Sequence, residues 1–213
     1  MAIDDLLDEH EQGERVRNWL RNNGAGLLGG IALGLAVIFG WKWWVAHREA
    51  RQQAGYAAFE QARKAIADGK DLKTAQARVQ ALASQDNPIY AQTAALLLAR
   101  AQIRAGEPEQ ALATLKAVPA DSPLAAYAKV RQARLLAAAG KPEQAASLLE
   151  GDGDASALEA RADALAQAGK LADARDLYFK ALAGMDIASP QRGLITVKLI
   201  HAGGTPPESP ESI

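Results

Sequence analysis

The segment Gly106-Glu-Pro-Glu-Gln-Ala111 recurs as Gly140-Lys-Pro-Glu-Gln-Ala145, which begins 34 residues later in the chain. A third copy, Gly169-Lys-Leu-Ala-Asp-Ala174, follows after 29 residues, and a weaker copy begins at Gly69. In each copy a glycine suited to a tight turn precedes residues that favour helix. Self-similarity at this period indicates that the chain is built from stacked helix pairs.

The residues expected to pack also recur, and they resemble those of the tetratricopeptide repeat family. Two helices cross closely only where their side chains are small, and a larger apolar residue is expected one turn beyond each crossing. The matching positions are Ala99, Ala133 and Ala162 in the first helix of each pair, Ala111, Ala145 and Ala174 in the second, and Leu115, Leu149 and Tyr178 one turn later.

The pattern predicts helix pairs over residues 49–84, 88–118, 123–150 and 156–185, with a short covering element from Leu194 to Ile200. Helix starts are predicted where a capping side chain precedes proline or has the spacing of a capping box. These starts are Asn87-Pro88, Ser122-Pro123, Ser189-Pro190 and Ser156-Ala-Leu-Glu159.

Residues 22–41, NNGAGLLGGIALGLAVIFGW, carry no charge. As a helix this segment is about 30 Å long, which matches the hydrocarbon core of a bilayer. Trp41, Trp43 and Trp44 stand at its end, and tryptophan rings favour the interface between membrane and water. A buried core helix would not end in such a cluster flanked by basic residues, so the pattern favours a transmembrane helix.

The sequence also indicates that this helix is retained as a signal-anchor. A cleaved signal peptide has an apolar region of about 7–15 residues and small residues at its cleavage site. Here the apolar stretch is longer, and the bulky run WKWWVAHREA follows it. The charges leave the orientation open, because three basic residues lie on each side of the span. They are Arg15, Arg17 and Arg21 before it and Lys42, Arg48 and Arg51 after it.

Small residues recur every four positions within the span, at Gly26, Gly30 and Gly34. This spacing lets a second helix approach closely in lipid, so the row is a candidate helix-packing face. Glycine is also common in membrane helices generally, and the sequence leaves both interpretations open.

Composition argues against nucleic-acid binding and against most catalytic chemistry. The chain has 24 basic and 25 acidic residues, so it lacks the basic signature of a nucleic-acid-binding protein. It has no cysteine, which excludes disulfides and thiol catalysis. Its three histidines are far apart, and it contains no phosphate loop, dinucleotide-binding glycine pattern or HExxH motif. We therefore predict a protein that is not an enzyme and uses no cofactor or metal ion.

The loop Asp152-Gly-Asp154-Ala-Ser156 resembles the start of a calcium-binding loop. Its sixth position is Ala157 and its twelfth is Asp163, where such loops have glycine and glutamate. A turn with a helix cap is the prediction for this segment.

Binding to other proteins is the function that remains. In stacked helix pairs the first helix of each pair lines a concave surface. Arg100 and Arg134 occupy equivalent positions, with Arg104 and Tyr127 expected nearby. They would form a groove for an extended or acidic peptide, because arginine pairs with carboxylates and tyrosine supplies apolar area. An ordinary solvated helix face explains the same residues, and both interpretations stay open.

The order of the parts resembles a more specific family. An acidic segment from Asp4 to Glu14, the stretch Gly13-Glu-Arg-Val-Arg-Asn-Trp-Leu20, one glycine-rich span, a tryptophan cluster and the repeats follow one another. This order, over about residues 3–200, is similar to that of the YfgM-like family of ancillary subunits of the bacterial SecYEG translocon. The resemblance supplies no catalytic residue.

This resemblance implies an all-α protein of the bacterial inner membrane, in which a single transmembrane helix is followed by a tetratricopeptide-like solenoid. The implied partners are the SecYEG translocon and a membrane-anchored periplasmic chaperone of the prolyl-isomerase type. Translocating polypeptides are further candidate partners, and the implied role is to hand them to periplasmic chaperones. The expected parts are an acidic cytoplasmic segment 1–21, the signal-anchor 22–41, a periplasmic repeat domain 42–200 and a disordered tail 201–213.

Two other functions stay open at this point. Balanced flanking charges permit the repeats to lie in the cytoplasm and to sequester a soluble regulatory protein. An enzyme with an unrecognised site would show a deep cleft with convergent titratable groups, whereas we expect a shallow concave surface.

Overall fold

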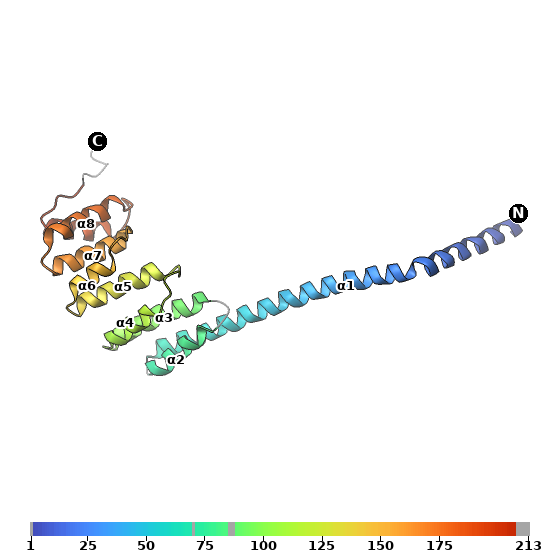
Figure 1. Ribbon diagram of the computed structural model, residues 1–213, viewed down its shortest axis with the longest axis horizontal. Coiled ribbons are helices and arrows are strands. Elements are labelled where there is room, and N and C mark those ends of the chain that lie inside the picture. The colour runs from blue at the N-terminus through green and yellow to red at the C-terminus, as the bar shows by residue number, and fades with distance from the viewer. Residues whose placement is uncertain (1, 70, 85–87, 208–213) are drawn as a thin grey trace. The chain divides into compact units, whose positions relative to one another are not determined.

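The computed structural model describes residues 2–69, 71–84 and 88–207, with side chains described from Gly13 onward. This part of the chain forms nine helices and no strand, which confirms the predicted all-α class (Figure 1). The helices are α1 (Ala2–Asp68), α2 (Leu72–Leu82), α3 (Pro88–Arg104), α4 (Pro108–Lys116), α5 (Ala125–Ala138), α6 (Pro142–Leu148), α7 (Ala155–Gln167), α8 (Leu171–Ala183) and α9 (Arg192–His201). The chain divides into two units, Met1–Ala54 and Gly55–Ile213.

The first unit contains the part of α1 that is apolar and long enough to cross a membrane. None of this apolar window is buried inside the protein. A helix in the core of a soluble protein would be covered, so full exposure is what a lipid-facing helix requires. After the span, the Trp43 ring stacks on His47 with centroids 5.4 Å apart, and the Arg48 guanidinium lies 5.6 Å from the Trp44 ring centroid. Aromatic and basic groups therefore gather where the membrane–water interface is expected.

In the second unit, the four predicted turn glycines have positive φ angles. The angles are +63° at Gly69, +79° at Gly106, +74° at Gly140 and +78° at Gly169. After the last three glycines, the next residue donates its backbone N–H to a carbonyl five residues earlier, as from Lys141 to Leu136 at 2.9 Å. This geometry pairs helix-end carbonyls that would otherwise lack partners, and glycine adopts it without strain.

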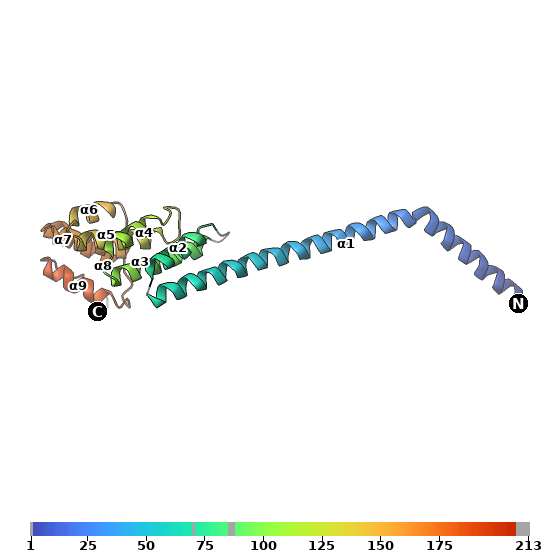
Figure 2. The same ribbon diagram turned by 90° about the horizontal axis from the view of Figure 1, so that it is seen from below.

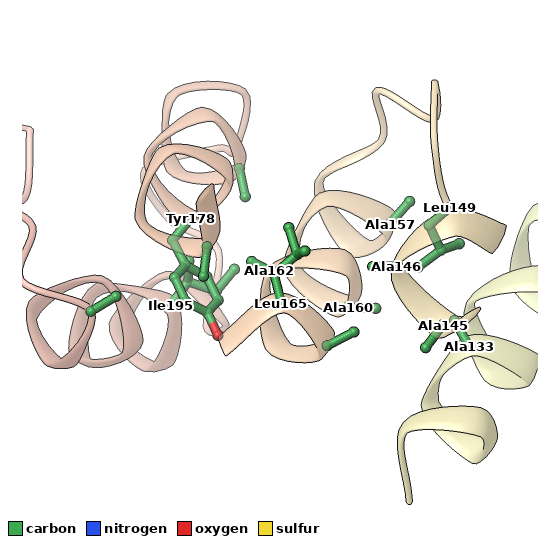
Figure 3. Close-up of a cluster of buried hydrophobic side chains, with 14 of the residues drawn as sticks. Ala133, Ala145, Ala146, Leu149, Ala157, Ala160, Ala162, Leu165, Tyr178 and Ile195 are labelled. Atoms are coloured by element: carbon green, nitrogen blue, oxygen red, sulfur yellow. The ribbon is translucent and has the colours of Figure 1, made fainter. Parts of the chain in front are cut away.

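The residues predicted at the helix crossings are buried in all three copies. The crossing alanines are at most 1% exposed, Leu115 and Leu149 are 0% exposed, and Tyr178 is 3% exposed. Figure 3 shows Ala133 of α5 beside Ala145 of α6 in this core. The weaker first copy forms the same kind of pair, because its alanines in α1 and α2 are also fully buried. They are Ala62 and Ala75.

Each predicted range holds one helix pair, formed by the end of α1 with α2, α3 with α4, α5 with α6, and α7 with α8. Consecutive helices from α2 to α9 contact one another, so the pairs stack in chain order. The predicted covering element is α9, which packs on α8 and buries Ile195 and Leu199 (Figure 2).

Some predicted helix starts differ from the observed ones. The capping-box prediction at Ser156 is wrong, because α7 begins at Ala155 and the Asp154 carboxylate accepts the Ser156 backbone N–H at 3.0 Å. Aspartate is as good a cap as serine, and here it stands two residues earlier. The Ser122 hydroxyl accepts the Leu124 N–H in a turn, so α5 begins only after it. Helix α9 likewise begins two residues after Pro190, and Asn87 lies outside the described residues.

The second unit begins at Gly55, the first buried residue of α1 among the described residues, and the predicted start of the repeat domain at residue 42 stays a prediction. At the other end, the segment predicted to be disordered starts at His201 and is described to Pro207. Ala202 is 9% exposed, and the Gly204 N–H donates to the Leu199 carbonyl at 2.9 Å, which closes the end of α9. Residues 208–213 lie outside the described residues.

Candidate protein-binding surface

The four predicted binding residues line two separate hollows rather than one groove. Arg100 and Arg104 of α3 line a hollow of about 410 Å³ between α3 and the end of α1. Tyr127 and Arg134 of α5 line another of about 570 Å³ between α5 and α7. Both lie between the first helices of neighbouring pairs, which is where a helix-pair stack presents its concave surface.

The first hollow, named here the arginine hollow, combines positive charge with apolar walls. Its lining residues are Arg63, Ile66, Ala67, Gly69, Leu72, Leu97, Arg100, Ala101, Arg104 and Ala105. The lining contains three guanidinium groups and no carboxylate.

The three arginines differ in their pairing. Arg63 is held by Glu60 through hydrogen bonds of 2.9 and 2.7 Å, and this contact lowers the pKa of the Glu60 carboxyl. Arg100 and Arg104 are exposed, and no ion pair joins either to another described residue. One helical turn separates them, so they lie on one face of α3. Two available guanidinium groups beside Ile66 and Leu97 suit a ligand that carries both a carboxylate and an apolar side chain.

The second hollow has mixed charge. The Arg134 Nη2 lies 3.3 Å from the Glu159 Oε2, and Asp152 pairs with Lys129 at 2.8 Å. Tyr127 is 62% exposed, and the Arg131 guanidinium lies 5.6 Å from the centroid of its ring. Arg134 is therefore already paired with a carboxylate of the same chain, and this hollow is less suited to an acidic ligand than the arginine hollow.

Glu159 also belongs to a polar network that the sequence did not reveal. The Lys198 ammonium of α9 donates to Glu159 at 2.7 Å and to Asp163 at 2.8 Å, and the Tyr178 hydroxyl donates to Asp163 at 2.6 Å. The only signal in the sequence is one lysine within the apolar run from Leu194 to Ile200. The network joins three helices, α7, α8 and α9.

Burial has opposite consequences for the two donors in this network. It would lower the pKa of Lys198, but the hydrogen bonds to Asp163 and Glu159 raise that pKa above its ordinary value. For Tyr178, burial and the bond to Asp163 both raise the pKa of the phenol. Carboxylates of α7 hold each group in its protonated form, so these contacts link α8 and α9 to α7.

The loop that resembles a calcium site is a capped turn, as predicted. Asp154 caps α7 and Asp152 pairs with Lys129. Within the described side chains, no three His, Asp or Glu residues form a set of metal ligands. His47 stacks on Trp43, His201 is exposed at the end of α9, and the side chain of His10 is outside the described part.

The glycine row of the span is open. A Cβ atom added at Gly26, Gly30 or Gly34 would have no heavy atom within 4 Å apart from its own helix backbone and neighbours. These three positions remain candidates for packing against another helix in the membrane.

Comparison with known proteins places this fold in a family. The model of the tetratricopeptide repeat-like domain matches residues 17–203. The ancillary SecYEG translocon subunit of Escherichia coli (strain K12) is 29% identical over 60% of this chain and 63% of the relative, so less than two thirds of that relative is covered. The protein of the same name from Haemophilus influenzae (strain ATCC 51907 / DSM 11121 / KW20 / Rd) is 23% identical over 54% of this chain and 74% of the relative. These similarities confirm the resemblance seen in the sequence, and the chain belongs to the tetratricopeptide repeat-like domain family.

Proposed function

We propose that this chain is a membrane-anchored adaptor that associates with the SecYEG translocon and catalyses no reaction. The observation that carries the proposal is the similarity to ancillary translocon subunits in a chain that joins an exposed apolar helix to a stack of helix pairs. Such stacks present extended surfaces for binding other proteins. The described hollows are open on that surface and suit peptide segments.

The adaptor acts in the bacterial inner membrane with its N-terminus in the cytoplasm and its repeats in the periplasm. The exposed apolar helix supports membrane anchorage, and the side on which the repeats lie is what the resemblance to the YfgM-like family implies. An alkaline phosphatase fusion at the C-terminus tests this orientation, because that enzyme is active only in the periplasm. A C-terminal fluorescent protein that matures only in the cytoplasm is expected to stay dark, and fluorescence would favour the sequestration of a cytoplasmic regulator instead.

Anchorage gives the adaptor its mechanism. Confinement beside the translocon raises the effective concentration of the repeats for emerging chains and for a membrane-anchored chaperone of the prolyl-isomerase type. The arginine hollow binds a segment of that chaperone that carries acidic and apolar residues, and newly translocated chains pass to the chaperone held there. Within the membrane, the row Gly26, Gly30 and Gly34 packs against helices of these partners.

Co-purification of SecYEG with the full chain from detergent-solubilised membranes tests the association. The test variant reverses both exposed charges of the hollow, Arg100→Glu and Arg104→Glu, and the control reverses Lys116, an exposed residue at the end of α4. We expect recovery of the chaperone with the double variant to fall by roughly tenfold, since two exposed charge pairs at about 0.7 kcal/mol each add up to the roughly 1.4 kcal/mol of a tenfold change. The control is expected to retain it.

The membrane association of all variants is checked by alkaline extraction of the membranes. If SecYEG is absent from every preparation, including the unmodified chain, the translocon proposal is wrong. If chaperone recovery is unchanged by the double reversal, the arginine hollow is not its binding site.

A further inference from the structure

Aromatic and basic side chains encircle α1 where its uncharged stretch ends. Trp41, Lys42, Trp43, Trp44 and Arg48 form this group, which we name the collar. The three tryptophans are 65%, 68% and 47% exposed, so much of each ring is left uncovered by the described residues. Large apolar surfaces are stabilised when they leave water, and rings this exposed therefore mark a contact with a partner.

The neighbouring stretch of α1 indicates that this partner is the membrane. Residues 22–41 carry no charge, and none of the apolar window of the helix is buried inside the protein. The collar continues the same helix without a break. Successive residues of a helix point about 100° apart, so residues 41–44 face four different directions. A single protein partner would cover one side of the helix, whereas lipid surrounds it on all sides.

The Arg48 guanidinium lies back along α1, toward the span. It is 5.6 Å from the centroid of the Trp44 ring, one turn earlier, and the Trp41 ring lies against Trp44 with centroids 5.4 Å apart. Side chains of a helix lean toward its N-terminus, which explains this direction. The Arg48 backbone is about 10 Å beyond Trp41, while the headgroup layer is roughly 5–8 Å thick on each side of a bilayer. The lean brings the charge of Arg48 into that layer.

Both cations of the collar are available to a headgroup. Among the residues that the structure describes, neither Lys42 nor Arg48 forms an ion pair. The sequence has no aspartate or glutamate between Glu14 and Glu49, so no carboxylate of the span competes for these cations. Arginine presents a planar fork that matches phosphate oxygens, and lysine adds a second positive charge to the same layer.

We infer that the collar binds the phosphate of an anionic phospholipid through Lys42 and Arg48, with the tryptophan rings packed among the surrounding headgroups. The phosphate of phosphatidylethanolamine is partly neutralised by the ammonium group of its own headgroup. Phosphatidylglycerol has no such cation, so its phosphate gains more from the collar. The inference rests on the membrane anchorage proposed above and is independent of association with the translocon.

The collar tryptophans can report which lipid surrounds them. The chain has four tryptophans, so the single change Trp19→Phe leaves those of the collar as its only ones. This full chain is reconstituted in vesicles of equal parts phosphatidylethanolamine and phosphatidylglycerol, in which one or the other lipid is brominated close to its headgroup. Bromine quenches tryptophan emission at close range. We expect brominated phosphatidylglycerol to quench more strongly, by an amount that corresponds to a roughly threefold enrichment at the collar, the gain from one exposed ion pair.

Two matched variants of this chain test the role of the collar cations. Lys42→Gln with Arg48→Gln should remove the preference, so that both brominated lipids quench equally. The control, Arg17→Gln with Arg21→Gln, removes the same charge from exposed positions at the other end of the span and should keep the preference. Equal quenching by the two lipids with the collar intact, or a preference that survives in the collar variant, would overturn the inference. Quenching by neither lipid would overturn the membrane anchorage as well.

Discussion

Gly140 and Gly184 both stand at a helix end, but only one of them needs to be glycine. Gly140 follows α5 with a φ angle of +74°, whereas Gly184 follows α8 with a φ angle of −88°. The same substitution, glycine to alanine, should therefore change the free energy of unfolding in opposite directions at the two positions.

The expected magnitudes follow from the local geometry. In the folded protein, a left-handed backbone conformation destabilises alanine by about 1–2 kcal/mol. Replacing glycine also reduces the conformational freedom of the unfolded chain, which stabilises the folded protein by roughly 0.4–1 kcal/mol. At Gly140 the new Cβ meets no heavy atom within 4 Å, so only these two effects act, and the net loss is about 1 kcal/mol. At Gly184 the new Cβ lies 3.7 Å from the Lys180 carbonyl oxygen, an ordinary contact. Gly184→Ala should therefore stabilise the protein by roughly 0.4–1 kcal/mol.

Urea unfolding of the full chain in detergent, followed by far-ultraviolet circular dichroism, measures both changes. The midpoint should fall for Gly140→Ala and rise for Gly184→Ala with the slope unchanged. In thermal unfolding the difference between the variants corresponds to about 2–4 °C per kcal/mol. If both variants shift in the same direction by the same amount, the positive φ angle is not what selects glycine in the repeats.

Two further predictions concern the core and the polar network. Leu149→Ala should cost about 2–5 kcal/mol of unfolding free energy because Leu149 is 0% exposed, while Leu171→Ala, at 47% exposed, should cost less than about 1 kcal/mol in the same urea titration. Stability should fall as the pH rises above about 10, because the folded state holds the protons of Tyr178 and Lys198 more tightly than the unfolded state does. Tyr178→Phe should flatten this alkaline decline in urea midpoints, and an unchanged slope would show that Tyr178 does not contribute to it.

The repeat architecture could be predicted from the sequence because its determinants are local. A turn glycine such as Gly140 reports the backbone conformation at its own position, and a crossing alanine such as Ala145 reports a close contact that every pair must make. Each pair packs mainly on its neighbours, so the order of the pairs in space follows their order in the chain. These features need no knowledge of distant contacts.

The features of the structure that differed from the predictions depend on competition between nearby residues or on contacts between residues far apart in the chain. At the start of α7 two capping residues stand two positions apart, and the pattern does not show that Asp154 is used instead of Ser156. The contact between Lys198 and Glu159 joins residues that are 39 positions apart, and no periodic signal marks it. The split of the predicted groove into two hollows likewise depends on the side chains that neighbouring pairs present.

Arg100 and Arg134 illustrate how equivalent positions acquire different surroundings. Each arginine lies on the first helix of its pair, and α5, which carries Arg134, packs on α7, the first helix of the next pair. Glu159, the partner of Arg134, stands three residues before the crossing alanine of α7. The residue three positions before the crossing alanine of α5 is Val130. Val130 is buried and offers no carboxylate, so Arg100 stays available. The repeat that follows Arg134 thus supplies a carboxylate to pair with it, and the equivalent position in the repeat that follows Arg100 carries none.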